Sequence, residues 1–198
     1  MLEQRIQQQF FDAADLKNQT AEALARPLAQ AAQSIVGALT GGGKLLVAGI
    51  GAASALAALF AARTMGRFER DRPGLAVLAL DSDATVHHAL AADGGGDSAL
   101  ARQVSTLGQP GDLLLLLDAE GRTGAALAAA RAAHGNDMAV IALVGRQAGA
   151  LGEELGDTDA LLPVPHDRAA RVLELHLIML HCLCDAIDLQ LLGEQEAA

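Results

Sequence analysis

Aromatic side chains are scarce in this chain, which has no tryptophan, no tyrosine and four phenylalanines among its 198 residues. Proteins that grip single-stranded nucleic acids stack the bases on aromatic rings, so the sequence does not offer such a platform. Basic side chains are also few, because 14 lysines and arginines stand against 24 acidic residues, for a net charge of -10. Attraction to DNA, RNA or an anionic membrane depends on clustered Lys and Arg, so direct binding to nucleic acid or membrane is not expected.

Cysteines and long apolar runs are rare as well. The two cysteines, Cys182 and Cys184, lie two positions apart in a helical pattern and would point about 200° apart, which excludes a disulfide or a shared metal between them. No uncharged apolar run reaches the roughly 18 to 20 residues that a membrane helix needs, and residues 3–9 are polar rather than a signal peptide. These features predict a cytoplasmic protein.

What the chain does contain is 52% apolar residues, mostly Ala and Leu, which suits one α/β domain over 1–198 with closely packed aliphatic side chains. Short apolar runs alternate with helical patterns from residue 44 to residue 165, and this region is expected to be the α/β core. Runs of this kind are typical of parallel strands covered on both faces. We predict five strands, at 45–48, 75–80, 113–117, 139–144 and 161–164, in a doubly wound parallel sheet.

Helical segments are expected on both sides of this core. Residues 1–41 predict two helices, the second opened by Pro27, and residues 167–192 predict one long helix. The latter is apolar nearly all round, so we expect it to pack against another subunit in a homo-oligomer. Its apolar tip, with Leu191 and Leu192, could dock a partner or pack on a neighbouring subunit.

Two strand-to-helix turns have the layout of a phosphate cradle. In the first, Gly49 and Gly51 precede a helix that begins near Ser54, and in the second, Gly121 precedes the predicted helix 125–133. A turn followed by a helix N-terminus aims N–H groups and a positive dipole end at one point, which is how proteins hold phosphates. The turns therefore predict a ligand pocket.

Acidic side chains occupy the second turn. Asp118 and Glu120 could cap free backbone N–H groups near the helix N-terminus, or they could pair with Arg122 and Arg63 and close the pocket. The pocket could also be re-aimed at a cationic or neutral ligand. The sequence leaves these three interpretations open.

Several motifs in order resemble the sugar isomerase (SIS) domain family, over about 190 residues. They are GIG at 49–51, FAA at 60–62, GRFERDRP at 66–73, RQV at 102–104, LGQPGD at 107–112, ALVGR at 142–146 and RVLELH at 171–176. The resemblance is to the phosphoheptose isomerase branch, and HCLCDAID at 181–188 resembles its DnaA-initiator-associating (DiaA) members. This resemblance implies a flavodoxin-like five-stranded domain in a tetramer, with ligand sites near subunit contacts.

Residues of the family's site are carried over only in part. Where the family has a Ser that contacts phosphate this chain has Ala53, and where the family has an Asn it has Ile50. The positions of the family's metal ligands and catalytic residues carry Leu59, Arg63 and Leu173. Of the catalytic pair only His181 remains, although a His beside Asp185 is often structural. The ligand-binding candidates are Gly49, Gly51, Ala53, Ser54, Asp93, Asp118, Glu120, Gly121, Arg122 and Thr123, with Arg63 beside the pocket.

The lost groups shape the functional prediction. Each charge-assisted hydrogen bond to phosphate contributes on the order of 1.5 to 3 kcal/mol, and a base and an acid each supply roughly 10² to 10⁴ in rate. We therefore expect a non-catalytic or impaired oligomeric scaffold without cofactor or metal, with the resemblance implying the replication initiator DnaA as partner. The alternative is a sedoheptulose 7-phosphate isomerase or sugar-phosphate-binding regulator, in which zinc would be the cofactor. The adjacent His87 and His88 diverge on a helix and suit a solvated pair better than a metal site.

Overall fold

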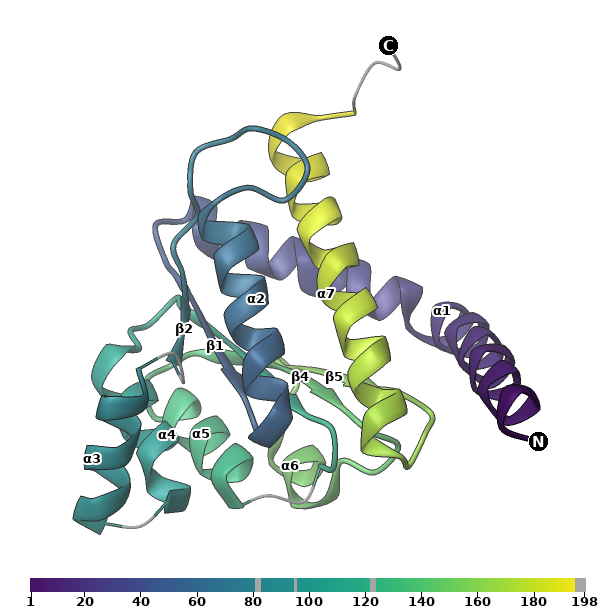
Figure 1. Ribbon diagram of the computed structural model, residues 1–198. Coiled ribbons are helices and arrows are strands. Elements are labelled where there is room, and N and C mark those ends of the chain that lie inside the picture. The colour runs from purple at the N-terminus through teal and green to yellow at the C-terminus, as the bar shows by residue number, and fades with distance from the viewer. Residues whose placement is uncertain (81–82, 95, 122–123, 195–198) are drawn as a thin grey trace.

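The computed structural model describes residues 1–80, 83–94, 96–121 and 124–194 and forms an α/β fold, shown in Figure 1. The helices are α1 (Leu2–Thr40), the short 3-10 turn η1 (Gly51–Ala53), α2 (Ser54–Met65), α3 (Ala84–Gly94), α4 (Gly96–Leu107), α5 (Gly124–His134), α6 (Gly149–Glu154) and α7 (Ala169–Leu192). The strands are β1 (Leu45–Gly49), β2 (Val77–Ala79), β3 (Leu113–Asp118), β4 (Ala139–Val144) and β5 (Ala160–Pro163).

All five strands run parallel in the order β2-β1-β3-β4-β5, which confirms the predicted doubly wound sheet. Successive side chains of a strand point to opposite faces, so the leucine run of β3 divides between two cores. Leu113, Leu115 and Leu117 join the core beneath α1, α2 and α7, whereas Leu114 and Leu116 join the core beneath α4 and α5. A continuous apolar strand is therefore what this two-sided sheet requires.

The N-terminal region is one helix, so the prediction of two helices is wrong. Pro27 lies inside α1 rather than at the start of a second helix. Leu24 and Ala31, on either side of the proline, are buried in the same core, and this packing holds both halves in place. A proline removes one helical hydrogen bond and bends the helix, and Figure 1 shows α1 changing direction along its length.

The long C-terminal helix is confirmed, and it begins two residues later than predicted, at Ala169. It lies beside α2 on the face shown in Figure 1, with Leu175, Leu183 and Ile187 among its buried side chains. Its Ile178 and Leu189 remain exposed. No helix in the described part of the chain combines the length and apolarity needed to cross a bilayer.

Candidate functional site

A cavity of about 390 Å³ lies where the chain changes direction across the sheet. The connection after β1 crosses by α2 and the one after β3 by α5, which cover opposite faces. Ligands of open α/β sheets bind at such switch points, outside the carboxyl ends of the strands. The cavity is lined by Gly49, Ile50, Gly51, Ser54, Ala84, His87, His88, Leu100 and Ala125.

The turn after β1 depends on two glycines. A Cβ on Gly49 would lie 2.2 Å from the carbonyl oxygen of Ala53, so the chain can only close this tightly without a side chain there. Gly51 has φ +58°, a left-handed conformation that glycine adopts without strain. The Ser54 hydroxyl donates to the Gly51 carbonyl oxygen at 2.8 Å, which fastens the start of α2. The turn therefore brings backbone directly to the cavity wall.

The turn after β3 is closed by its own carboxylate. Asp118 is 2% exposed, and its Oδ1 accepts hydrogen bonds from the backbone N–H of Glu120 at 3.1 Å and of Gly121 at 3.0 Å. Gly121, with φ +66°, approaches the Gln147 carbonyl too closely for any side chain. Asp118 thus does what the capping interpretation expects, although it caps the turn and not α5, which begins at Gly124. Two N–H groups of the second turn are therefore already bonded within the chain.

A buried histidine lies close to this turn. The Nε2 of His176 on α7 is 3.4 Å from the Val144 carbonyl oxygen, and its side chain has no exposed surface. Burial lowers the pKa of His176 to about 4, against smaller opposing effects of the Val144 carbonyl and the Asp118 charge. The imidazole is therefore neutral near pH 7, so we assign it to the packing of α7.

The cavity contains only some of the residues that the sequence singled out. Gly49, Gly51 and Ser54 line it, whereas Ala53 is buried behind the turn. Asp93 is exposed near the end of α3, and the predicted Arg122 and Thr123 lie outside the described residues.

Other predicted residues lie elsewhere on the fold. Glu120 lines a separate cavity of about 190 Å³, with Arg146 and His166. The ring of His181 on α7 lies against Phe68, with 5.6 Å between ring centroids, and it does not line the cavity after β1. Within a single chain, His181 therefore does not reach the turn after β1.

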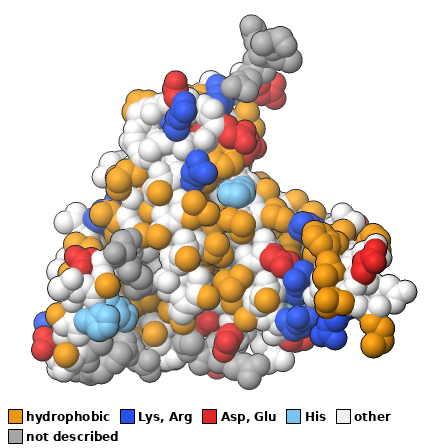
Figure 2. All heavy atoms as spheres, viewed as in Figure 1, with side chains coloured by type: hydrophobic (Ala, Val, Ile, Leu, Met, Phe, Trp, Pro, Cys, Tyr) orange, Lys and Arg blue, Asp and Glu red, His pale blue; other side chains and the backbone are white. Residues whose placement is uncertain are grey.

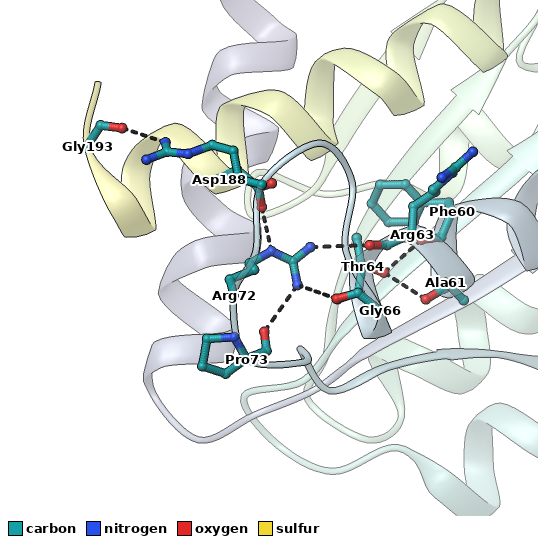
Figure 3. A network of polar contacts seen from close by, with 10 residues as sticks. Phe60, Ala61, Arg63, Thr64, Gly66, Arg72, Pro73, Asp188 and Gly193 are labelled. Atoms are coloured by element: carbon teal, nitrogen blue, oxygen red, sulfur yellow. Dashed lines mark hydrogen bonds and ion pairs between the residues drawn. The ribbon is translucent and has the colours of Figure 1, made fainter. Parts of the chain in front are cut away.

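Arg63, predicted to lie beside the pocket, is an exposed residue near the end of α2. Figure 3 shows its guanidinium pointing away from the polar network in which its backbone takes part. At the tip of α7, Leu192 is exposed, whereas Leu191 packs partly on the core. Of this pair, Leu192 is the one that offers free apolar surface.

Arg72 and Asp188 form a buried ion pair that ties the loop after α2 to α7 (Figure 3). Their side chains are 1% and 3% exposed, and Arg72 Nε lies 2.5 Å from Asp188 Oδ1. The guanidinium also donates to four backbone carbonyl groups, those of Arg63, Thr64, Gly66 and Pro73. Arg63 and Thr64 lie in the last turn of α2 and Gly66 is its C-cap, a region where carbonyl groups lack helical partners. This network fixes α2, and with it the cavity turn, against α7.

Sequence reasoning missed His87 and His88 as site residues, because it placed them on a solvated helix surface. The helix was predicted correctly, but its place beside the cavity at the turn after β1 was not, and that place makes both residues line the cavity. Two adjacent histidines near a predicted turn were the available signal.

The described residues do not form a metal site within one chain. Throughout 1–80, 83–94, 96–121 and 124–194, no group of three His, Cys, Asp or Glu side chains is placed to hold an ion. The family's metal positions carry Leu59, Arg63 and Leu173, none of which offers a ligand atom. Cys184 is buried, which raises its thiol pKa to about 12, and Cys182 is exposed. The residues present do not fit the zinc that the resemblance implies.

Comparison with known proteins gives close matches over the full length of the chain. Residues 9–145 match the family model described as SIS domain. The phosphoheptose isomerase of Methylibium petroleiphilum is 52% identical over 99% of this chain and 98% of its own length. The solved structure of phosphoheptose isomerase GmhA from Neisseria gonorrhoeae superposes with a TM-score of 0.90 at 37% identity, covering 95% of this chain and 99% of that one.

These relatives overturn the predicted non-catalytic scaffold, because similar proteins over the whole length are named as isomerases. The expectation that the chain is not an enzyme is wrong for the same reason. A HobA-DnaA complex from Helicobacter pylori is similar at 14% identity, with a TM-score of 0.56 over 100% of this chain and 99% of that one. That likeness shows the fold alone, so binding to DnaA stays an untested prediction.

Proposed function

The chain belongs to the SIS domain family, and from this membership we propose that it is an isomerase that interconverts the ketose and aldose forms of a phosphorylated sugar. The proposed substrate is sedoheptulose 7-phosphate, in keeping with the names of its relatives. The observation that carries the proposal is the cavity of about 390 Å³ at the switch point of the sheet. Its size lies within the range of about 300 to 1,000 Å³ that is usual for small-ligand sites.

The backbone around the cavity supports binding of the phosphate group of such a substrate. The turn at Gly49 and Gly51 leads into α2, and α5 begins beside the same cavity at Gly124, with Ala125 in the lining. N–H groups and the positive ends of two helices thus converge on one space, which favours an anion. The sugar would extend from there along the cavity.

Isomerisation moves a proton between C1 and C2 and another between the two oxygens, so a base and an acid are needed. We assign a proton transfer to His181, the one member of the family's catalytic pair that the chain keeps. His181 lies outside the cavity of its own chain, so this assignment requires a neighbouring subunit to bring the two together. Since the described residues do not fit zinc, no step in this proposal passes through a metal.

Self-association is therefore part of the proposal, in the form of a homotetramer in the cytoplasm. Figure 2 shows hydrophobic side chains gathered over α2 and α7, where Leu59 and Ile178 are each 36% exposed. The N-terminal half of α1 also presents large apolar side chains, those of Leu2, Ile6, Phe10 and Phe11. Apolar surface of this extent is typical of subunit contacts.

The test is turnover of sedoheptulose 7-phosphate by the purified protein, followed by NMR, with and without added zinc. We expect formation of the aldose phosphate, and a drop in kcat of roughly 10²-fold to 10⁴-fold for His181→Gln. Cys182→Ser, an exposed neighbour on the same helix, is the control and should keep the wild-type rate. Absence of product under both conditions would refute the proposed function, and an active His181→Gln variant would remove the role of His181.

A further inference from the structure

We infer that Phe68, in the loop that follows α2, is a positioning residue that fixes the orientation of the His181 ring on α7. The inference deepens the proposed function and rests on it for the reaction, in which His181 transfers a proton. It adds to that reaction an apolar side chain that acts only through His181.

The first step is the contact between the two rings. The imidazole of His181 lies against the phenyl ring of Phe68, with 5.6 Å between the centroids and 33° between the ring planes. Both side chains are partly buried. Aromatic pairs attract each other at such separations, and the attraction corresponds to a population factor of about two to ten. The contact therefore favours one orientation of the imidazole over its alternatives.

The second step is that polar contacts do not orient this ring. Among the residues that the structure describes, no hydrogen bond or ion pair reaches the nitrogens of His181. This holds also for Asp185, which follows one turn later on α7. A hydrogen-bonding partner would occupy one of the two ring nitrogens, whereas a phenyl ring leaves both of them available for proton transfer. An apolar neighbour is therefore a suitable means of holding this histidine.

The third step is that the loop carrying Phe68 is fixed to α2 at its base. The backbone N–H of Leu75 donates to the Thr64 carbonyl oxygen at 3.2 Å, which closes the loop onto the last turn of the helix. A Cβ on Gly74 would lie 2.4 Å from the Met65 carbonyl oxygen, so the two ends of the loop approach too closely for a side chain there. The base of the loop therefore has a defined place.

The fourth step is that two arginines fasten the same loop to α7. Arg72 forms the buried ion pair with Asp188, and Arg70 Nη1 donates to the Gly193 carbonyl oxygen at 2.7 Å. Figure 1 shows the loop beside the C-terminal half of α7, in agreement with these contacts. Phe68 is thus held against the helix by the polar contacts of its own loop, and it does not depend on the ring contact alone.

The expected effect is on turnover rather than on substrate binding. Proton transfer requires that the imidazole points at the reacting atoms, so a ring with several orientations spends less time in the productive one. Removal of the phenyl ring should lower kcat by about twofold to tenfold, the population factor of an aromatic pair. KM should stay unchanged, because Phe68 does not line the cavity after β1.

The kinetic experiment compares variants that differ in the ring alone. Phe68→Leu and Phe68→Met remove the ring and keep an apolar side chain for its packing on the core. Phe68→Tyr keeps the ring and should retain the wild-type kcat. Glu69→Gln, at an exposed position of the same loop, is the control and should also behave like the wild type. Melting temperatures show whether each variant is folded.

A second measurement reports on the ring directly. The imidazole C–H signals are recorded by NMR after labelling of histidine, and those of His181 are identified by their loss in His181→Gln. A neighbouring phenyl ring shifts these signals. Phe68→Leu and Phe68→Met should therefore move the His181 signals and leave those of the other histidines in place, whereas Phe68→Tyr and Glu69→Gln should move none.

The outcomes separate this inference from the proposed function. Should the wild type not turn over the sugar phosphate, the proposed function fails, and the NMR signals alone then decide whether Phe68 holds the ring. Unmoved His181 signals in both Phe68→Leu and Phe68→Met would overturn the inference. Moved signals with a wild-type kcat would overturn it as well, and so would an equal loss of kcat in Phe68→Tyr, because the ring would then not be what matters.

Discussion

Replacing the buried imidazole of His176 by an amide should make the protein less sensitive to acid. Burial lowers the pKa of this side chain from 6.5 to about 4 in the folded protein, because a charged ring would be desolvated there. The unfolded chain regains the ordinary pKa and binds a proton between these two values. Below pH 6.5 the unfolded state therefore binds more protons than the folded state, and the free energy of unfolding falls as the pH falls.

The size of this effect follows from the two pKa values. At roughly 1.4 kcal/mol per pKa unit, the change from 6.5 to about 4 corresponds to about 3 kcal/mol. The loss begins near pH 6.5 and is complete below about pH 4. Since a domain of this kind has roughly 5 to 15 kcal/mol of stability, one histidine should account for a substantial part of its acid sensitivity.

His176→Gln removes the titrating group and keeps an N–H donor for the Val144 carbonyl. Urea unfolding of both proteins is measured between pH 7.5 and pH 4 at one protein concentration. The other titrating groups are present in both proteins, so they cancel in the difference. We expect the variant to lose about 3 kcal/mol less than the wild type over this range. Parallel curves of unfolding free energy against pH would refute the reasoning.

The sheet could be predicted from the sequence because its strands are buried on both faces. The leucines of β3 form a continuous apolar run, and the same pattern located β4 to the residue. The prediction was less accurate for β2, which is shorter than expected and lies at the edge of the sheet with Leu78 exposed. An edge strand lacks a second neighbour, so an apolar run does not determine how far its pairing extends.

The single N-terminal helix could not be predicted from local signals. Pro27 favours a new helix start, but buried residues on both sides of it belong to one core. Helix breaking by proline costs roughly 3 kcal/mol. Burial of several aliphatic side chains at about 1.5 to 3 kcal/mol each outweighs that cost, and it becomes visible only in the tertiary structure.

Only the part of the candidate site that local sequence determines could be predicted. Glycine spacing located the turn at Gly49 and Gly51, because backbone constraints leave a mark in the sequence. That His87 and His88 line the same cavity depends on how α3 packs against α4, which no local sequence pattern reports. The prediction of a non-catalytic scaffold rested on the side chains that are missing from the two turns, and the similar isomerases overturn it.

Two further predictions concern the frame around the cavity. Arg72→Met and Asp188→Asn should each lower the free energy of unfolding by roughly 3 to 5 kcal/mol, because each leaves a buried charge without its partner. In a urea double-mutant cycle the double variant should lose less than the sum, and additive losses would show that the pair is not coupled. Gly49→Ala should abolish the thermal shift caused by inorganic phosphate, since its Cβ would lie 2.2 Å from the Ala53 carbonyl oxygen and force the turn open. Gly37→Ala is the matched control, because a Cβ there meets nothing within 4 Å on an exposed part of α1. A Gly49→Ala variant with the wild-type thermal shift would mean that the anion is bound away from this turn.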